Sequence, residues 1–320
     1  MPHFHRIAAL LLSIVSLLAS AAPAAQWTST PYNPAKPITA TDWYVAHDAG
    51  TGFRVCSAIA QQWTPLAGAG ATLRHSGGMV LAVQQGNSIH AWSALSNTAA
   101  VQPMVGLISS QFNSATSFCM FRDLAPGTPA GVIWTFSAYT STWTSITPAA
   151  AWTLEYGTNV ALIQTAGQSH GYSPYTNQWT TLDAAGSAPY CGTEYAAVNL
   201  AGQSRYAAFS ALRGTWSLSP PYPSAGSAFG LINSPTATVC AIRTEIGSST
   251  QHSYSAYSPF TGQWATSPLV HPNVSSKQMT ALGHGVRIMD SDTSARFDYF
   301  AGGTGQWHTL TGPNLTEDNG

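Results

Sequence analysis

The chain has 320 residues, with 11 lysines and arginines against 12 aspartates and glutamates, and its formal net charge is −1. This balance gives no sign of the basic patch that nucleic acid or an anionic membrane surface would require, so neither partner is expected. Charged residues are only 7% of the composition, which disfavours helices, whose exposed faces usually carry Glu, Lys and Arg, and favours strands and tight turns.

The first 24 residues have the layout of a secretory signal peptide. Arg6 stands near the start, residues 7–18 form a largely apolar run, and residues 19–25 are small. Because a helix that spans a bilayer needs about 20 apolar residues, this run is too short to cross a membrane. We therefore expect cleavage after Ala24, a secreted or periplasmic protein without membrane insertion, and a mature chain, 25–320, that forms a single domain.

One short motif then recurs seven times along the chain. A large residue precedes a serine, and a tryptophan closes the motif six residues later, with alanine replacing the tryptophan once and the serine once. From Trp63 to Trp307 the mean spacing is about 41 residues, a period typical of four-stranded propeller blades. The copies are Ser57–Trp63, Ser93–Ala99, Ser137–Trp143, Ser173–Trp179, Ser210–Trp216, Ser258–Trp264 and Ala301–Trp307.

Each column of the motif has a physical reason. The position two before the tryptophan is Asn or Gly in five copies, and these residues tolerate the positive φ of a hairpin turn. The residue before the serine is aromatic in six copies and Cys56 in the first. Side chains alternate faces along a strand, so this residue and the tryptophan form the buried side of a hairpin.

An apolar run lies upstream of each hairpin and predicts the second strand of each blade, buried on both faces. The runs are 44–46, 80–83, 118–121, 160–163, 196–198, 239–242 and 286–288. A weaker segment before each, such as 71–74 or 279–282, predicts the innermost strand. The predicted fold is an all-β, seven-bladed β-propeller of four-stranded blades, with six or eight blades as alternatives.

The hairpins resemble the kelch repeat, whose third and fourth strands are joined by Tyr-Asp-Pro-x-Thr-x-x-Trp. Residues 172–179 and 257–264 match this pattern with serine in place of aspartate. The Gly-Gly pair that kelch blades carry after the second strand is missing, so the chain is kelch-like, similar to the central propeller of galactose-oxidase-type proteins. Copper-radical chemistry of that kind needs a cysteine, two tyrosines and two histidines that converge, and Cys56 stands in the buried column, which argues against it.

Charged residues gather at the ends of the second strands: His47, Asp48, Arg122, Asp123, Arg243, Glu245, Asp290 and Asp292. One interpretation is that they are strand ends facing water. The other is a ligand pocket around the propeller channel, in which the two arginines bind a carboxylate or sugar hydroxyls. Other charged residues, among them His75, Glu194 and His284, stand near the start of the second strand and are predicted on the opposite face.

Local catalytic motifs are scarce. No zinc-binding His-x-x-x-His helix, Cys-x-x-Cys pair or Gly-x-Ser-x-Gly elbow occurs in the sequence, and residues 290–294 lack the glycine and glutamate of a calcium loop. No cofactor or metal is predicted. The sequence favours a monomeric binding or interaction propeller that recognises a glycan or protein on the face carrying the loops after the second strands. The alternative is an enzyme acting on a sugar or acidic sugar, such as an epimerase, lyase or hydrolase.

Two further expectations concern the cysteines and the ring. Cys119, Cys191 and Cys240 lie 24 or 25 residues before their repeat tryptophans, which predicts nearly equivalent positions on different blades. Packed sheets lie about 10 Å apart and a disulfide needs Cα atoms within about 7 Å, so no pair among them should be bridged. Either Trp27 or Trp307 is expected to close the ring, with the other peripheral.

Overall fold

The structure is a computed structural model. It describes residues 34–36, 38–108, 113–124, 131–149, 151–222, 231–246, 251–268, 271–272, 278–290 and 296–311. The predicted signal peptide, Trp27 and Asp292 lie outside the described residues. In the described part of the chain, no helix is both long and apolar enough to span a membrane.

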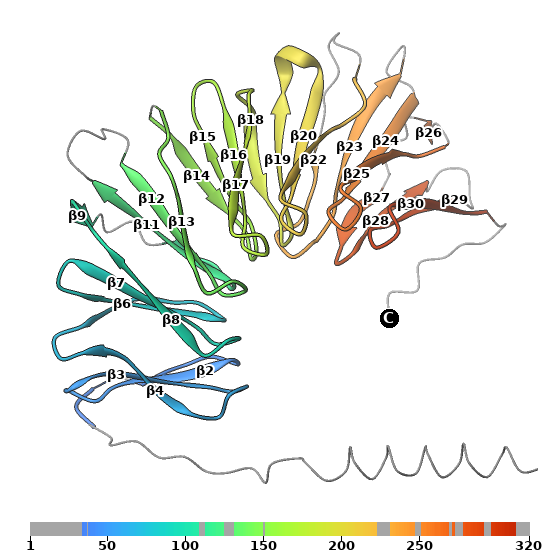
Figure 1. The fold of residues 1–320 in the computed structure, drawn as a ribbon. Coiled ribbons are helices and arrows are strands. Elements are labelled where there is room, and N and C mark those ends of the chain that lie inside the picture. Colours follow the sequence, from blue (N-terminus) through green and yellow to red (C-terminus); the bar gives the residue numbers. More distant parts are fainter. Residues whose placement is uncertain are drawn as a thin grey trace, which may run out of the picture.

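Seven antiparallel sheets follow one another along the chain, and we number them 1 to 7 in that order (Figure 1). Sheet 1 contains β1 (Ile38–Ala40), β2 (Tyr44–Asp48), β3 (Gly52–Ser57) and β4 (Trp63–Gly68). Sheet 2 contains β5 (Thr72–Ser76), β6 (Val80–Gln85), β7 (Ser88–Ser93) and β8 (Thr98–Pro103). Sheet 3 contains β10 (Asn113–Ser114), β11 (Phe118–Leu124), β12 (Val132–Ser137) and β13 (Trp143–Ile146), and β9 (Leu107–Ile108) pairs with β11.

The remaining four sheets repeat this plan. Sheet 4 contains β14 (Thr153–Tyr156), β15 (Ala161–Gln164), β16 (Ser169–Ser173) and β17 (Gln178–Leu182). Sheet 5 contains β18 (Ser187–Cys191), β19 (Tyr195–Leu200), the 3-10 helix η1 (Ala201–Gln203), β20 (Arg205–Ser210) and β21 (Thr215–Leu218). Sheet 6 contains β22 (Leu231–Ile232), β23 (Cys240–Ile246), β24 (Gln251–Ser258) and β25 (Gln263–Thr266), and β26 (His271–Pro272) pairs with β24. Sheet 7 contains β27 (Gln278–Leu282), β28 (Gly285–Asp290), β29 (Arg296–Ala301) and β30 (Gln306–Thr311).

These seven sheets confirm the predicted fold class. Four strands lie side by side in chain order in every sheet, each antiparallel to its neighbour, as in the blades of a seven-bladed β-propeller. Within the described residues, each sheet is built from one continuous stretch of chain. Trp307 lies on β30, the ordinary fourth strand of sheet 7. Among the described residues, no strand pairing joins sheet 7 to sheet 1.

The hairpin turns confirm the interpretation of the Asn/Gly column. Asn97, Asn177, Gly214, Gly262 and Gly305 have φ between 53° and 70°. The two copies that carry other residues, Gln61 and Ser141, adopt the same conformation, with φ of 53° and 57°. The repeat register therefore fixes the turn even where the residue type does not favour it.

Neighbouring sheets pack through the aromatic column. Trp92, Phe136, Tyr172, Phe209, Tyr257 and Phe300 are fully buried. In sheets 3 to 7 the repeat tryptophan lies against this aromatic ring, with ring centroids 5.1 to 5.3 Å apart. In four of these sheets its indole Nε1 also donates to a backbone carbonyl of the preceding sheet, as from Trp216 to Thr180 at 2.9 Å.

The serine column links each sheet to the next. Six serine hydroxyls donate to backbone carbonyls of the following sheet, for example Ser57 to Ala94 at 2.6 Å and Ser210 to Pro259 at 2.7 Å. Sheet 7 carries Ala301 at this position and has no hydroxyl to donate. The hydrogen bonds of the serine column therefore join the sheets in order from sheet 1 to sheet 7 and end at sheet 7.

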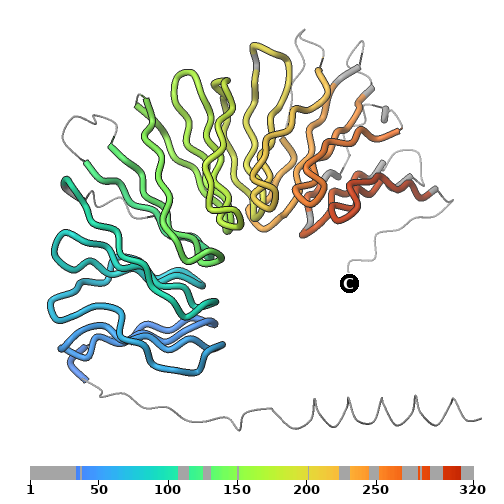
Figure 2. Tube along the Cα trace, in the orientation of Figure 1, coloured from blue at the N-terminus to red at the C-terminus, as the bar shows by residue number. Residues whose placement is uncertain are grey.

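The sheets fan out along an arc, with sheet 1 and sheet 7 at its two ends (Figure 2). The hairpins between third and fourth strands, and the turns between first and second strands, lie on the inner side of the arc. The loops that follow the second strands lie on its outer side. The two sets of loops are therefore at opposite ends of the strands.

The expected equivalence of three cysteines was wrong for one of them. Cys119 and Cys240 lie on second strands, whereas Cys191 ends the first strand of sheet 5. The connection between second and third strands is shorter in sheet 5, residues 201–204, than in sheet 3, residues 125–131, so an equal count back from the tryptophan reaches a different strand. These cysteines belong to three different sheets and are free thiols, as is Cys56.

Candidate functional site

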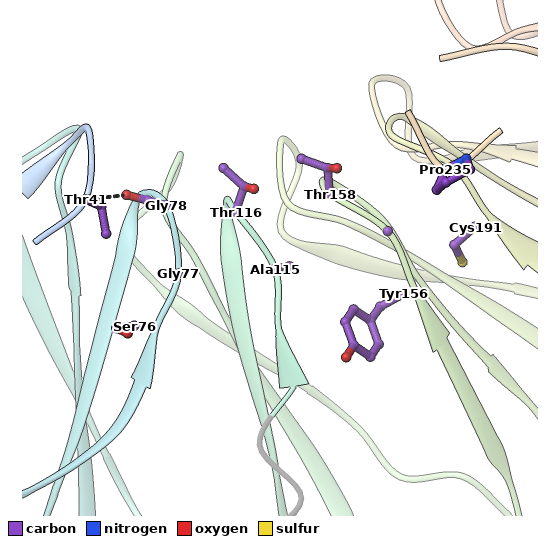
Figure 3. Close-up of a pocket in the computed structure, with 11 residues that line it drawn as sticks. Thr41, Ser76, Gly77, Gly78, Ala115, Thr116, Tyr156, Thr158, Cys191 and Pro235 are labelled. Atoms are coloured by element: carbon purple, nitrogen blue, oxygen red, sulfur yellow. Dashed lines mark hydrogen bonds between the residues drawn. The ribbon is translucent and has the colours of Figure 1, made fainter. Parts of the chain in front are cut away.

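A hollow of about 470 Å³ lies among the turns that join first to second strands. Six sheets contribute to its wall, and Figure 3 shows the turn residues Gly78, Thr116 and Thr158 at the tips of neighbouring sheets. The wall presents hydroxyl groups, backbone and one large ring, and none of its residues is charged. The residues are Thr41, Ser76, Gly77, Gly78, Ala115, Thr116, Tyr156, Gly157, Thr158, Cys191 and Pro235.

A chain of hydrogen bonds between successive sheets holds these turns together. The Thr41 hydroxyl donates to the Gly78 carbonyl at 2.9 Å. Further along, the Met79 amide donates to the Thr116 carbonyl at 2.7 Å, and the Thr116 amide to the Thr158 carbonyl at 3.2 Å. Equivalent bonds continue through Thr193 and Ala237 to Gly283 in sheet 7. The wall of the hollow is therefore a continuous belt rather than a set of independent loops.

Glycine is needed where the turns approach most closely. A methyl group on Gly157 would collide with the carbonyl oxygen of Gly192 in the next sheet, and one on Gly77 would collide with the carbonyl oxygen of Ala115. His75 packs behind Gly77 and is buried, and burial lowers the pKa of His75 to about 4. This imidazole is therefore neutral at physiological pH.

The large ring in the wall belongs to Tyr156, at the end of β14, whose exposed fraction is 43%. Thr158 follows it in the turn, so a ring face and a hydroxyl stand two residues apart. This pairing offers both an apolar contact and a hydrogen-bonding group. Such a combination fixes the orientation of a small polar ligand.

A buried polar cluster joins two of the turns that contribute to the hollow. Asn159 comes directly after Thr158, and its Nδ2 donates to Oε1 of Glu194 at 2.6 Å. The Tyr175 hydroxyl donates to the same oxygen at 3.0 Å. Glu194 is only 8% exposed, and burial raises its pKa, which the two hydrogen bonds partly oppose.

Two stacked tyrosines cover this cluster from the hairpin side. The rings of Tyr139 and Tyr175 lie 4.3 Å apart between centroids with an interplanar angle of 27°. Tyr139 is partly exposed, while the Tyr175 hydroxyl reaches inward to Glu194. The pair joins the hairpins of sheets 3 and 4 to the first turn of sheet 5.

The predicted site residues lie at the other end of the strands. Asp48 accepts a hydrogen bond from the Gly50 amide at 2.8 Å and pairs with Lys36 at 3.1 Å. The hydrogen bond from Gly50 is the main cause that lowers the pKa of Asp48, and Lys36 lowers it further. His47, beside Asp48 on β2, is buried. Asp123 is 2% exposed and accepts hydrogen bonds from the Val105 and Gly106 amides at 3.0 and 2.8 Å.

The arginines of the predicted site occupy equivalent positions in sheets 3 and 6. Arg122 extends over the ring of Trp152, 5.2 Å from its centroid, and Arg243 is partly buried on β23. Glu245 and Asp290 stand on β23 and β28, and their side chains, like Asp292, lie outside the described residues. Figure 1 spreads these strand ends along the outer side of the arc, so the structure does not bring them around the hollow.

The position of Arg122 has a repeated structural role. In sheet 4 the same position is Gln164, whose Nε2 donates to the Gly186 carbonyl at 3.1 Å. In sheet 5 it is Asn199, which accepts a hydrogen bond from the Tyr222 hydroxyl at 2.7 Å. Each of these contacts, like that of Arg122 with Trp152, holds the segment that leads into the following sheet.

The sequence correctly placed these residues on the opposite side from the turns, but it did not reveal the hollow. The sequence signal of the hollow is a Gly or Ala followed by Thr shortly before several second strands.

The comparisons with known proteins add no family. No family model matches the chain, and no curated protein matches it. Among solved structures, Hsv2p of Kluyveromyces lactis is 12% identical and covers 86% of this chain and 98% of its own, with a TM-score of 0.27. A eukaryotic initiation factor is 11% identical, covers 90% and 92%, and has a TM-score of 0.31. A mitotic checkpoint complex chain is 13% identical, covers 92% and 95%, and has a TM-score of 0.28. These values carry no argument about function, and the kelch-like subtype stays a prediction.

Proposed function

We propose that the protein is a secreted binding protein that takes a neutral glycan in the hollow between the turns. The observation that carries the proposal is the wall itself, which combines threonine and serine hydroxyls, backbone groups and the Tyr156 ring with no charged side chain. Sugars present hydroxyls at their edges and apolar C–H faces, which match hydroxyl groups and an aromatic ring. The volume of about 470 Å³ falls within the range of small-ligand sites, about 300 to 1,000 Å³.

The composition of the wall favours binding over hydrolysis. Glycosidases use a pair of carboxyl groups that flank the scissile bond, and no Asp or Glu belongs to the residues that line the hollow. Asp42 and Glu155 stand beside Thr41 and Tyr156 in the sequence, and neither lines the hollow. Glu194 is buried beneath Tyr175. An acidic sugar would also lack a cation to pair with in this wall. The alternative of an enzyme acting on such sugars is therefore less well supported.

A glycan array with the mature chain, 25–320, tests the proposal. Tyr156→Ala should abolish most of the signal of a positive glycan, and Thr158→Val should weaken it, with melting temperatures near that of the unchanged protein. Arg122→Ala is the matched control on the outer side of the arc and should bind normally. Loss of binding in Arg122→Ala with full binding in Tyr156→Ala would instead support the strand-end site predicted from the sequence.

Secretion forms part of the same proposal. It rests on the arrangement of residues 1–24, where a basic start, an apolar run and a small-residue cleavage site follow in order. Expression of the full chain in a secreting host, with mass spectrometry of the exported product, should give an N-terminus at Ala25. An exported product that retains the apolar run would contradict it.

A further inference from the structure

The interfaces between sheets follow one size rule. A small residue on the third strand of one sheet faces the aromatic residue on the third strand of the next. Val55 packs with Trp92, Ala91 with Phe136, Ala208 with Tyr257, and Ala256 with Phe300. Gly171 lies so close to Phe209 that a methyl group there would collide with the ring. Thr135, which is fully buried, holds the small position opposite Tyr172.

The two ends of the arc reverse this rule. Tyr299 of sheet 7 stands at the position of the small residues, directly before Phe300. Cys56 of sheet 1 stands at the position of the aromatic residues, directly before Ser57. A large residue therefore replaces a small one on sheet 7, and a small residue replaces a large one on sheet 1. The combined volume of the pair resembles that of the six established pairs.

Both residues lie on faces that an additional sheet could cover. Cys56 shares its face with its cross-strand partners Val45 and Trp63, and Val45 is 37% exposed. Tyr299 shares its face with Arg287 and His308 and is 36% exposed. The second strands of sheets 2 to 6 bury the residues equivalent to Val45 completely or almost completely, for example Cys119 and Ala161.

Glycine at the start of β28 prepares the sheet 7 face for such a contact. Gly285 replaces the bulky residues, such as Val80, Phe118 and Tyr195, with which the second strand begins in other sheets. The Tyr299 ring lies directly over it, where any side chain would collide with the ring. On this face of sheet 7, the large side chain is therefore on the third strand, at Tyr299, instead of on the second strand, at Gly285.

Sheets 1 and 7 carry the donors and acceptors for one more interface of the same kind. Four repeat tryptophans donate to the carbonyl one residue after the repeat position of the preceding sheet, as Trp264 does to Ser217 at 3.2 Å. By this register, Trp63 of sheet 1 would donate to the carbonyl of His308. The belt of turns, in which Thr238 donates to Gly283 at 2.7 Å, would continue from the His284 amide to the Asp42 carbonyl.

We infer that sheet 7 packs face to face on sheet 1 of the same chain, with the Tyr299 ring filling the space above Cys56. The propeller then closes without a sheet shared between the two chain ends. The stem of Arg287 can lie along the interface while its guanidinium reaches the edge. The missing hydroxyl at Ala301 makes this interface weaker by one hydrogen bond than the other six.

A double-mutant cycle in the mature chain tests the inference. Cys56→Phe should lower the melting temperature by several degrees, because it restores the aromatic residue opposite Tyr299 and overfills the interface. Tyr299→Ala should also lower it. The double variant restores the size rule of the other six interfaces. Its loss of melting temperature should therefore be smaller than the sum of the losses of the two single variants. The control pair, Cys56→Phe with Tyr139→Ala in sheet 3, should be additive.

Two outcomes would overturn the inference. Additive effects of Cys56→Phe and Tyr299→Ala would show that the two faces do not meet. Coupling that disappears on dilution, with a dimer in sedimentation velocity, would show that sheet 7 of a second copy covers sheet 1. If Cys56→Phe does not fold, Cys56→Leu takes its place, and a bismaleimide cross-link between Cys56 and Tyr299→Cys gives an independent measurement. Tryptic mass spectrometry should find that link within one chain, while Leu218→Cys, on the outermost strand of sheet 5, should give none.

Discussion

At the scale of single residues, one serine per sheet has a disproportionate role. The hydroxyl of Ser210 donates to the Pro259 carbonyl in the next sheet and accepts a hydrogen bond from the Arg213 amide in its own turn. It therefore stabilises the hairpin and the interface between sheets together. Because the site is fully buried, water cannot replace either bond when the hydroxyl is removed.

We expect Ser210→Ala to lower the free energy of unfolding by about 1 to 3 kcal/mol, the cost of leaving a buried polar group unpaired. Sheet 7 offers the matched control, since Ala301 already lacks the hydroxyl. Ala301→Ser should change stability little, or raise it if sheet 7 meets sheet 1. Urea unfolding measures both, and a loss below about 0.5 kcal/mol for Ser210→Ala would contradict the role given to the serine column.

Glu194 gives a prediction about pH. Burial raises its pKa above the value in the unfolded chain, so the folded state binds the proton more tightly than the unfolded state does. Its contribution to stability is then fully present below the unfolded pKa, about 4.3, and is lost as the pH rises through the folded pKa. The melting temperature of Glu194→Gln minus that of the unchanged protein should therefore increase across this window. A difference that stays constant or decreases would show that the carboxyl group is not strained by burial.

At the scale of strands and turns, the repeat tryptophans combine packing with a hydrogen bond. Trp216 lies 5.3 Å from Phe209 between ring centroids and donates to Thr180. Trp179 lies 5.1 Å from Tyr172 in the same manner, but its buried Nε1 has no hydrogen-bond partner. The two residues therefore separate the contribution of the ring from that of the N–H group.

Replacing each by phenylalanine should give unequal losses. Trp216→Phe removes ring area and a hydrogen bond that has a net worth of about 0.5 to 1.5 kcal/mol, whereas Trp179→Phe removes ring area and a buried unpaired donor. We expect Trp216→Phe to be the more destabilising of the two in urea unfolding. Equal losses would mean that the hydrogen bonds from the tryptophans contribute nothing beyond packing.

The strands and hairpins were predictable because their signals are local and repeated. The apolar runs locate the second strands, and the column of Asn and Gly locates the turns closely enough to include Gln61 and Ser141, whose own propensities give no such signal. The assignment of Cys191 was wrong because counting from the tryptophan ignores loop length. Periodicity is reliable only within the hairpin that defines it.

The hollow could not be predicted in the same way. Its wall takes one to three small residues from each of six sheets, and no single stretch of sequence contains the pattern. Charges were the conspicuous feature of the sequence, yet Asp123 satisfies two backbone amides and Arg122 covers Trp152. In a chain with few charges, these residues hold connections between sheets, and whether they also bind a ligand stays a prediction.

At the scale of the whole molecule, contacts between neighbouring sheets join the seven sheets into one structure. Serine hydroxyls, tryptophan N–H groups and the belt of turns each join sheet to sheet in order. Each new sheet therefore extends the core, and sheets 1 to 6 also extend the wall of the hollow. Packing of sheet 7 on sheet 1 would add the seventh interface and complete that wall.

The central claim is that this wall binds a glycan, and a crystal structure of the mature chain with the strongest glycan from the array tests it most directly. We predict electron density for a sugar ring against the Tyr156 side chain, with hydroxyls within hydrogen-bonding distance of Thr116 and Thr158. Density beside Arg122 or Arg243 on the outer side of the arc, with an empty hollow between the turns, would contradict the claim.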